Sequence, residues 1–129
     1  MKKFTVLIAD DHSLLRDGLR ALLSNTDDLE VIGEAEDGQD TIAKTRQLQP
    51  DLVLLDLSMP IINGTDAIRA IKQRHPEIRI IALTVHKSEE YVRATLDAGA
   101  DGYVLKDDSS KDLLTSIRNV RKGTIHLSP

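Results

Sequence analysis

The chain alternates short aliphatic runs with amphipathic stretches from its beginning almost to its end. The aliphatic runs predict strands at about residues 4–9, 29–36, 51–56, 79–84 and 102–106. The amphipathic stretches predict helices at about residues 13–24, 38–48, 64–75, 88–98 and 110–122. Strict alternation of strands and helices favours an α/β fold, in which a parallel sheet carries helices on both faces.

The stretch 13–24 has the clearest helical period. Its leucines fall on one face together with Gly18, whereas Arg16, Asp17 and Arg20 fall on the other face. We therefore expect this helix to pack its leucine face against the sheet and to carry its charged residues on the outer face.

The composition fits one small domain inside the cell. At 129 residues, the chain has the common size of a single domain. Its net charge is −4, its lysines and arginines are dispersed, and its aromatic residues are Phe4, Tyr91 and Tyr103, so this segment alone should not bind DNA. The absence of cysteine suits the cytosol, and the apolar run after Met-Lys-Lys is too short for a signal peptide. We expect a cytoplasmic protein that does not bind membranes.

Polar side chains stand at the carboxyl ends of four predicted strands. They are the pair Asp10 and Asp11, then Asp56, Thr84 and Lys106. Because parallel strands all end at the same edge of a sheet, these residues should share one rim, where ligands bind in such folds. Each residue alone has a simpler explanation: a helix cap for the acidic pair, a turn for the lone acid, a β-former for the threonine and a solvated lysine. Their common position favours a functional site.

Three carboxylates on one rim indicate a metal ion. They would repel one another, and a hard cation with oxygen ligands, Mg²⁺ above all, relieves that repulsion. One acid of the leading pair should bind the metal directly, and the other can act through water. We favour Asp11 as the direct ligand, with Asp56 and the main-chain carbonyl of Ser58, while Asp10 completes the acidic set. A cation, an ammonium and a hydroxyl around one carboxylate form a receptor for a phosphoryl group in transfer.

These residues resemble the motif set of a known family. Asp10-Asp11, Asp56 with the following Leu-Ser-Met-Pro, Thr84 and Lys106 are similar to the receiver domain of two-component response regulators, and the resemblance covers nearly the whole chain. It implies a doubly wound, flavodoxin-like sheet of five strands in the order 2-1-3-4-5, flanked by five helices. It also implies Asp56 as the phosphoacceptor, Mg²⁺ as the cofactor, and Thr84 and Lys106 as phosphoryl sensors. On this resemblance the protein is a switch and not an enzyme with turnover of its own.

The resemblance extends to partners and to domain organisation. The phrases Ala-Asp-Asp-His-Ser-Leu-Leu-Arg-Asp-Gly-Leu and Leu-Ser-Pro resemble the NarL/FixJ branch, whose members usually continue into a LuxR-type helix-turn-helix domain. Residues 1–122 would then form the receiver and 123–129 the start of a linker to a DNA-binding domain absent from this chain. The implied partners are a sensor histidine kinase and, after phosphorylation, a second copy of the chain. Asp107 departs from the proline that many receivers carry there, which leaves the cis peptide of the family open at this bond.

Further residues are predicted to time and transmit the switch. Tyr103 matches the switch aromatic of the family, although it could equally be a half-buried core ring with its hydroxyl in water. Ser58 and His86 lie two residues beyond Asp56 and Thr84, the positions that tune phosphate lifetime in similar receivers. The alternative to His86 is that it points to solvent and that Val85 limits the access of water.

Two other functions remain as competitors. A magnesium-dependent phosphatase would need a second acid two residues after Asp56, where Ser58 stands instead. A flavodoxin-like nucleotide binder would need phosphate donors after the first strand, where Asp10 and Asp11 repel phosphate.

Overall fold

The computed structural model describes residues 3–58, 63–85, 87–106 and 110–123, together with the backbone of 126–127. The strands are β1 (Phe4–Ala9), β2 (Leu29–Ala35), β3 (Leu52–Asp56), β4 (Arg79–Thr84), β5 (Gly102–Leu105) and β6 (His126–Leu127). The helices are α1 (Ser13–Ser24), α2 (Gly38–Leu48), α3 (Gly64–Arg74), α4 (Glu89–Asp97) and α5 (Ser110–Arg121). All five predicted strands and all five predicted helices are confirmed, and β6 is an addition that the sequence pattern did not indicate.

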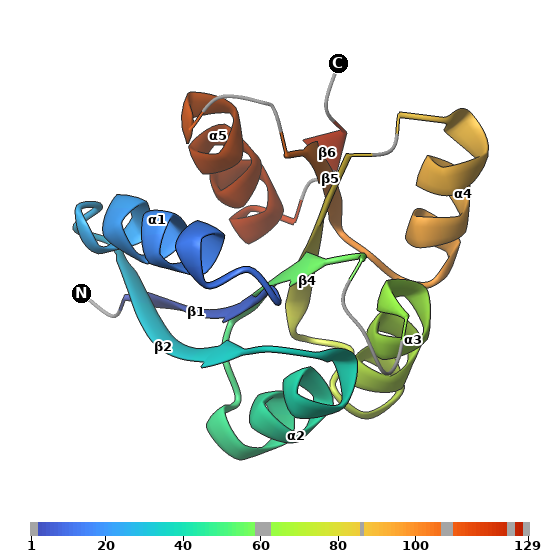
Figure 1. The fold of residues 1–129 in the computed structure, drawn as a ribbon, viewed down its shortest axis with the longest axis horizontal. Helices are drawn as coiled ribbons and strands as arrows, with labels where there is room; N and C mark the ends of the chain where they lie inside the picture. Colours follow the sequence, from blue (N-terminus) through green and yellow to red (C-terminus); the bar gives the residue numbers. More distant parts are fainter. Residues whose placement is uncertain (1–2, 59–62, 86, 107–109, 124–125, 128–129) are drawn as a thin grey trace.

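The sheet has the order β2-β1-β3-β4-β5-β6, and every neighbouring pair is parallel. The predicted order 2-1-3-4-5 is thereby confirmed, with β6 placed beside β5 at the edge (Figure 1). The chain first moves outward from β1 to β2 and then returns past β1 to β3. The strand order therefore reverses between β1 and β3, which is where open α/β sheets bind ligands.

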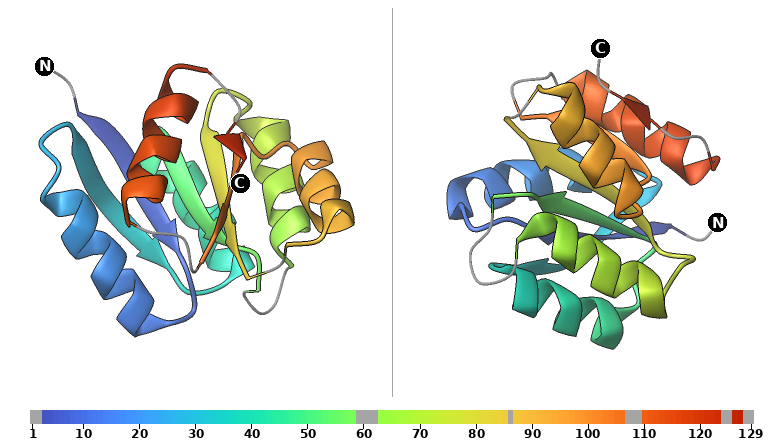
Figure 2. Two further views of the ribbon diagram at one scale, coloured as in Figure 1. Left: turned by 90° about the horizontal axis from the view of Figure 1, so that it is seen from above. Right: turned by 90° about the vertical axis from the view of Figure 1, so that its right-hand side faces the viewer.

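Helices cover both faces of the sheet, as the alternation of elements predicted (Figure 2). One core layer lies under α1 and α5, and the other lies under α2, α3 and α4. β3 shows the two layers best, because Leu52 and Leu54 face the first layer, Val53 and Leu55 face the second, and all four are fully buried. The continuous aliphatic run is thus explained by burial on both faces of a central strand. Among the described helices, none is long and apolar enough to cross a membrane.

The helix starts differ in a way that matters for the rim. Asp37, Asn63 and Ser88 each cap a helix by accepting a hydrogen bond from a backbone amide of the first turn. His12 stands at the same position before α1 but makes no such bond with its side chain. Its ring lies among the acidic residues of the rim instead.

Candidate functional site: an acidic rim with one lysine

The sheet brings the predicted polar residues to one edge. Asp10 directly follows β1, Asp56 ends β3, Thr84 ends β4, and Lys106 directly follows β5. Register supports this placement, since Asp56 pairs with Leu83 of β4 and the Lys106 amide donates to the Thr84 carbonyl at 2.8 Å. The rim predicted from the strand ends is therefore present.

Asp56 is fully buried and strongly held. Its Oδ1 accepts hydrogen bonds from the Ser58 amide at 3.0 Å and from the Ser58 hydroxyl at 2.8 Å, and its Oδ2 lies 3.1 Å from the Lys106 ammonium. Burial alone would raise the pKa of Asp56, but these hydrogen bonds and the charge of Lys106 outweigh it, so the pKa is lowered. Asp56 is consequently a carboxylate at neutral pH.

Asp10 is equally buried but less well compensated. Its Oδ1 accepts a hydrogen bond from the His12 amide at 2.8 Å, while its Oδ2 lies 3.7 Å from the Lys106 ammonium and accepts no hydrogen bond from the described part of the chain. Burial and the nearby charge of Asp56 raise the pKa of Asp10 against the opposing effects of His12 and Lys106. A buried, unpartnered carboxylate oxygen fits a site that receives a cation.

Asp10, Asp11, His12 and Asp56 form one cluster of possible metal ligands. One ligand atom from each lies within 4.8 Å of the others. The His12 Nδ1 is 3.2 Å from Asp10 Oδ1 and 3.1 Å from Asp11 Oδ1. The predicted site did not include His12, although its position directly after two acids was the available signal. The three acids fit a metal site, whereas the position of the Ser58 carbonyl relative to it stays a prediction.

Thr84 and Tyr103 are both buried, 3% and 2% exposed, on neighbouring strands. Burial raises the pKa of the Tyr103 phenol, and a side-chain hydrogen bond with Thr84 acts in the opposite direction. The alternative of a half-buried ring with its hydroxyl in water is therefore wrong. The two side chains are in contact, while their roles in sensing and switching stay predictions.

Two of the residues predicted to set the phosphate lifetime, Ser58 and Val85, lie at the outer side of the rim. Ser58 is exposed while bonded to Asp56, and Val85 is 65% exposed. His86 and Asp107 lie outside the described residues, so the predictions about His86 and about the peptide after Lys106 remain open.

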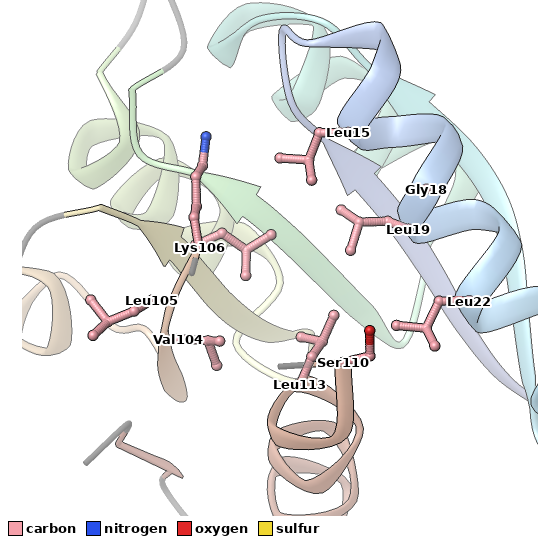
Figure 3. Close-up of a pocket in the computed structure, with 10 residues that line it drawn as sticks. Leu15, Gly18, Leu19, Leu22, Val104, Leu105, Lys106, Ser110 and Leu113 are labelled. Carbon is pink, nitrogen blue, oxygen red and sulfur yellow. The ribbon is translucent and has the colours of Figure 1, made fainter. Parts of the chain in front are cut away.

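An apolar groove opens beside the rim, between α1 and α5 (Figure 3). Leucines of α1 line one wall, Val104 and Leu113 line the other, and Lys106 lies at one end. A side chain added at Gly18 would meet no atom within 4 Å, so the groove is open at that point. Leu14, one turn earlier on α1, is 84% exposed.

The fold, the acidic rim and a comparison with models of known protein families together identify the family of this chain. The model of the response regulator receiver domain matches residues 6–118, and the chain belongs to that family. It is therefore the receiver domain of a two-component response regulator, a phosphoacceptor switch whose class works with histidine kinases.

Curated relatives include a transcriptional regulatory protein and a response regulator. The chain is 34% identical over 127 residues to the transcriptional regulatory protein DegU of Brevibacillus brevis, covering 98% of this chain and 54% of the relative. It is 40% identical over 124 residues to the response regulator VraR of Staphylococcus aureus, covering 96% and 59%. The chain thus spans little more than half the length of these curated relatives.

Solved structures share the whole architecture. A LuxR-family response regulator from a species of Aurantimonas superposes with a TM-score of 0.94 at 30% identity, covering 99% of this chain and 91% of that one. The isolated receiver domain of RcsB from Salmonella enterica serovar Typhimurium, solved with the phosphomimetic BeF₃⁻, gives a TM-score of 0.91 at 32% identity, covering 98% and 94%. A further similar structure, with a TM-score of 0.90 at 32% identity over 98% of this chain and 64% of that one, contains RcsB dimers bound to DNA.

Proposed function

We propose that this domain accepts a phosphoryl group on Asp56 from a sensor histidine kinase and converts it into a change of conformation and dimerisation. The observation that carries the proposal is the environment of the Asp56 carboxylate. It is buried, kept ionised, and held through Oδ1 by Ser58, so that Oδ2, beside Lys106, is the oxygen left to act as nucleophile.

In the transfer step, Oδ2 of Asp56 attacks the phosphorus of a phosphohistidine. A phosphorus–oxygen bond forms, the phosphorus–nitrogen bond breaks, and the electron pair returns to the imidazole nitrogen of the kinase. The Lys106 ammonium pairs with the carboxylate at rest and with phosphoryl oxygens after transfer. The Thr84 hydroxyl turns to the phosphoryl group, and the Tyr103 ring follows it as the switch element.

Mg²⁺ fits the rim as the cofactor. Asp10, Asp11, Asp56 and the main-chain carbonyl of Ser58 would hold it, with Asp11 as the direct ligand of the leading pair. When bound, the ion neutralises the negative charge that gathers on the phosphoryl oxygens during transfer. The buried Asp10 Oδ2 supports this assignment, because it otherwise stays without a hydrogen bond from the described residues.

The kinase must cover the rim to deliver its phosphohistidine, and the apolar groove between α1 and α5 is the adjoining surface. Leu14 stands exposed beside it, and Gly18 leaves room for an apolar side chain of the partner.

Ser58, His86 and Val85 set how long the phosphoryl group survives, by orienting or excluding the attacking water.

We also propose a transcriptional output. Residues 1–122 act as the receiver. Residues 123–129, which include the edge strand β6, begin the linker to a LuxR-type helix-turn-helix domain in a cytoplasmic regulator that dimerises on phosphorylation. Curated relatives of which the aligned part covers only 54% and 59% support the further domain, and the name of DegU states a transcriptional role for that relative. The structure of RcsB dimers on DNA supports dimerisation as the active form.

The direct test is a phosphorylation assay with Mg²⁺ and acetyl phosphate. We expect a single acid-labile adduct on the wild type, no adduct on Asp56→Asn, and a normal adduct on Asp66→Asn, whose carboxylate lies exposed on α3. A wild type that forms no adduct, or an Asp56→Asn variant that forms the same one, overturns the proposal. Repeated turnover of a phosphate monoester would instead favour a phosphatase.

A further inference from the structure

Arg16 of α1 reaches back to the main chain of the acidic pair. Its Nη1 donates to the Asp10 carbonyl at 2.6 Å, and its Nε donates to Glu34 Oε1 at 3.0 Å. The side chain is only 13% exposed, although the helical period places it on the polar face of α1. Figure 1 shows why this reach is possible, since α1 lies alongside β1 and β2, whose ends carry Asp10 and Glu34.

These contacts complete the restraint of the Asp10 backbone. The Asp10 amide already donates to the Ala35 carbonyl at 3.0 Å, so both main-chain polar groups of Asp10 are held by neighbouring elements. The Asp10 carbonyl and the Asp11 amide belong to one planar peptide unit. Arg16 therefore fixes the rotation of the peptide that joins the two acids, and with it the directions in which their side chains leave the backbone.

Glu34 keeps the guanidinium in place. Its Oε1 accepts from Arg16, and its Oε2 accepts from Arg20 Nε at 2.6 Å. Burial would raise the pKa of Glu34, but the two arginines lower it below the ordinary value, so this acceptor stays charged. A planar guanidinium held by a carboxylate on one side and a carbonyl on the other has a defined orientation, which a lysine ammonium cannot reproduce.

We propose that Arg16 is a positioning residue for divalent-cation binding, which it supports by holding the Asp10–Asp11 peptide in the orientation that the metal site needs. The inference rests on the proposed function of the acidic cluster as a Mg²⁺ site. In the simpler interpretation, Arg16 forms only a partly exposed salt bridge, which would stabilise the fold without affecting metal binding.

Arg20 offers a matched control. It shares the Glu34 carboxylate with Arg16 and is also an arginine of α1, but it contacts the opposite oxygen and is 44% exposed. No contact between Arg20 and the acidic pair is present among the described residues. Loss of Arg20 thus removes a similar ion pair while leaving the Asp10 carbonyl with its donor.

The test is a Mg²⁺ titration of the full chain without any phosphodonor, followed by amide NMR at Asp11, with unfolding in EDTA measured in parallel. We expect Arg16→Met and Arg16→Lys each to weaken Mg²⁺ binding about tenfold, which is the lower end of the range for residues that orient metal ligands. The Mg²⁺ affinity of Arg20→Met should stay within about twofold of the wild-type affinity. Failure of Arg16→Lys to restore affinity separates orientation by the planar fork from the mere presence of a positive charge.

Three results would overturn the inference: unchanged Mg²⁺ affinity in a folded Arg16→Lys, an equal loss in Arg20→Met, or a wild type that binds no Mg²⁺. If Arg16→Met does not fold, Arg16→Lys and Glu34→Gln carry the decision, since the latter keeps an acceptor but loosens the guanidinium. Phosphorylation is assayed separately. If the wild type binds Mg²⁺ but accepts no phosphoryl group, the proposed function is refuted. The role of Arg16 is then still decided by the Mg²⁺ titration.

Discussion

The ends of β1 and β3 present two buried carboxylates that behave in opposite ways. Asp10 and Asp56 are both fully buried and both lie near the same lysine. Nevertheless, the pKa of Asp10 is raised and the pKa of Asp56 is lowered. Burial is common to both, so the difference must come from the groups that surround each carboxylate.

The donors account for the difference. Two hydrogen bonds from Ser58 reach Asp56, and the Lys106 ammonium is closer to it, at 3.1 Å against 3.7 Å for Asp10. Asp10 has the His12 amide as its main hydrogen-bond donor, and the charge of Asp56 raises its pKa further. The end of β3 is therefore built to keep a nucleophile charged, whereas the end of β1 is incompletely compensated and suited to receive a cation.

The largest expected effect comes from removing the cation that both acids share. In EDTA, Lys106→Met should lower the free energy of unfolding by about 2 kcal/mol, because it leaves two buried carboxylates without their ammonium. Mg²⁺ should recover much of this loss by replacing the missing charge. Lys111→Met, at an exposed position of α5, is the control and should change little in urea unfolding. Equal behaviour of the two variants would show that Lys106 does not stabilise the rim.

A second experiment tests the contrast between the acids directly. In EDTA at pH 7, Asp10→Asn should raise the free energy of unfolding by about 1 kcal/mol, because it removes a poorly compensated buried charge. Asp56→Asn should have the opposite sign, since that charge is favourable where it lies. Denaturant unfolding of both variants checks the signs, and stabilisation by both substitutions would contradict the contrast.

Much of this site could be predicted from the sequence, because the topology of a parallel sheet determines which residues meet. Runs buried on both faces identified the strands, and the polar residues at their ends, including Asp56 and Thr84, had to share one rim. The strand β6 could not be predicted, since two residues carry no periodic pattern and their pairing depends on where the chain turns after α5.

The predictions from the sequence failed mainly at residues with long or rotatable side chains. Helical periodicity assigns a residue to a face by its Cα position, whereas Arg16 extends back along α1 and buries its guanidinium at the Asp10 carbonyl. His12 was not among the predicted site residues, but its ring turns toward two carboxylates that the sequence places beside it. In both cases the decisive contact depends on the conformation of the side chain, which the hydrophobic pattern of the sequence does not encode.

The contrast also predicts a pH dependence. The pKa of Asp10 in the folded state lies above its ordinary value of 3.8, so the folded state binds that proton more tightly and loses stability as the pH rises through this window. The advantage of Asp10→Asn over the wild type in EDTA should therefore vanish below about pH 4, grow as the pH rises, and level off at up to about 1 kcal/mol. Urea unfolding of both proteins between about pH 3 and 7 checks this course. An advantage that stays constant across the range would mean that the substitution acts through packing and not through charge.

The smallest expected effect comes from one hydroxyl on Asp56. Ser58→Ala removes the bond of 2.8 Å to Asp56 Oδ1 but keeps the Ser58 amide and Lys106, so the lowering of the Asp56 pKa should become weaker without reversing. Because Ser58 is exposed, the loss of unfolding free energy should be only about 0.5 kcal/mol. Thr65→Ala is a matched control, since its hydroxyl also donates at 2.8 Å, to the neutral side chain of Asn63. Carbon-13 NMR titration of the Asp56 carboxyl measures the pKa. If Ser58→Ala leaves it unchanged, the amide and the lysine alone keep Asp56 ionised, and the hydroxyl of Ser58 is free to act on the phosphate lifetime alone.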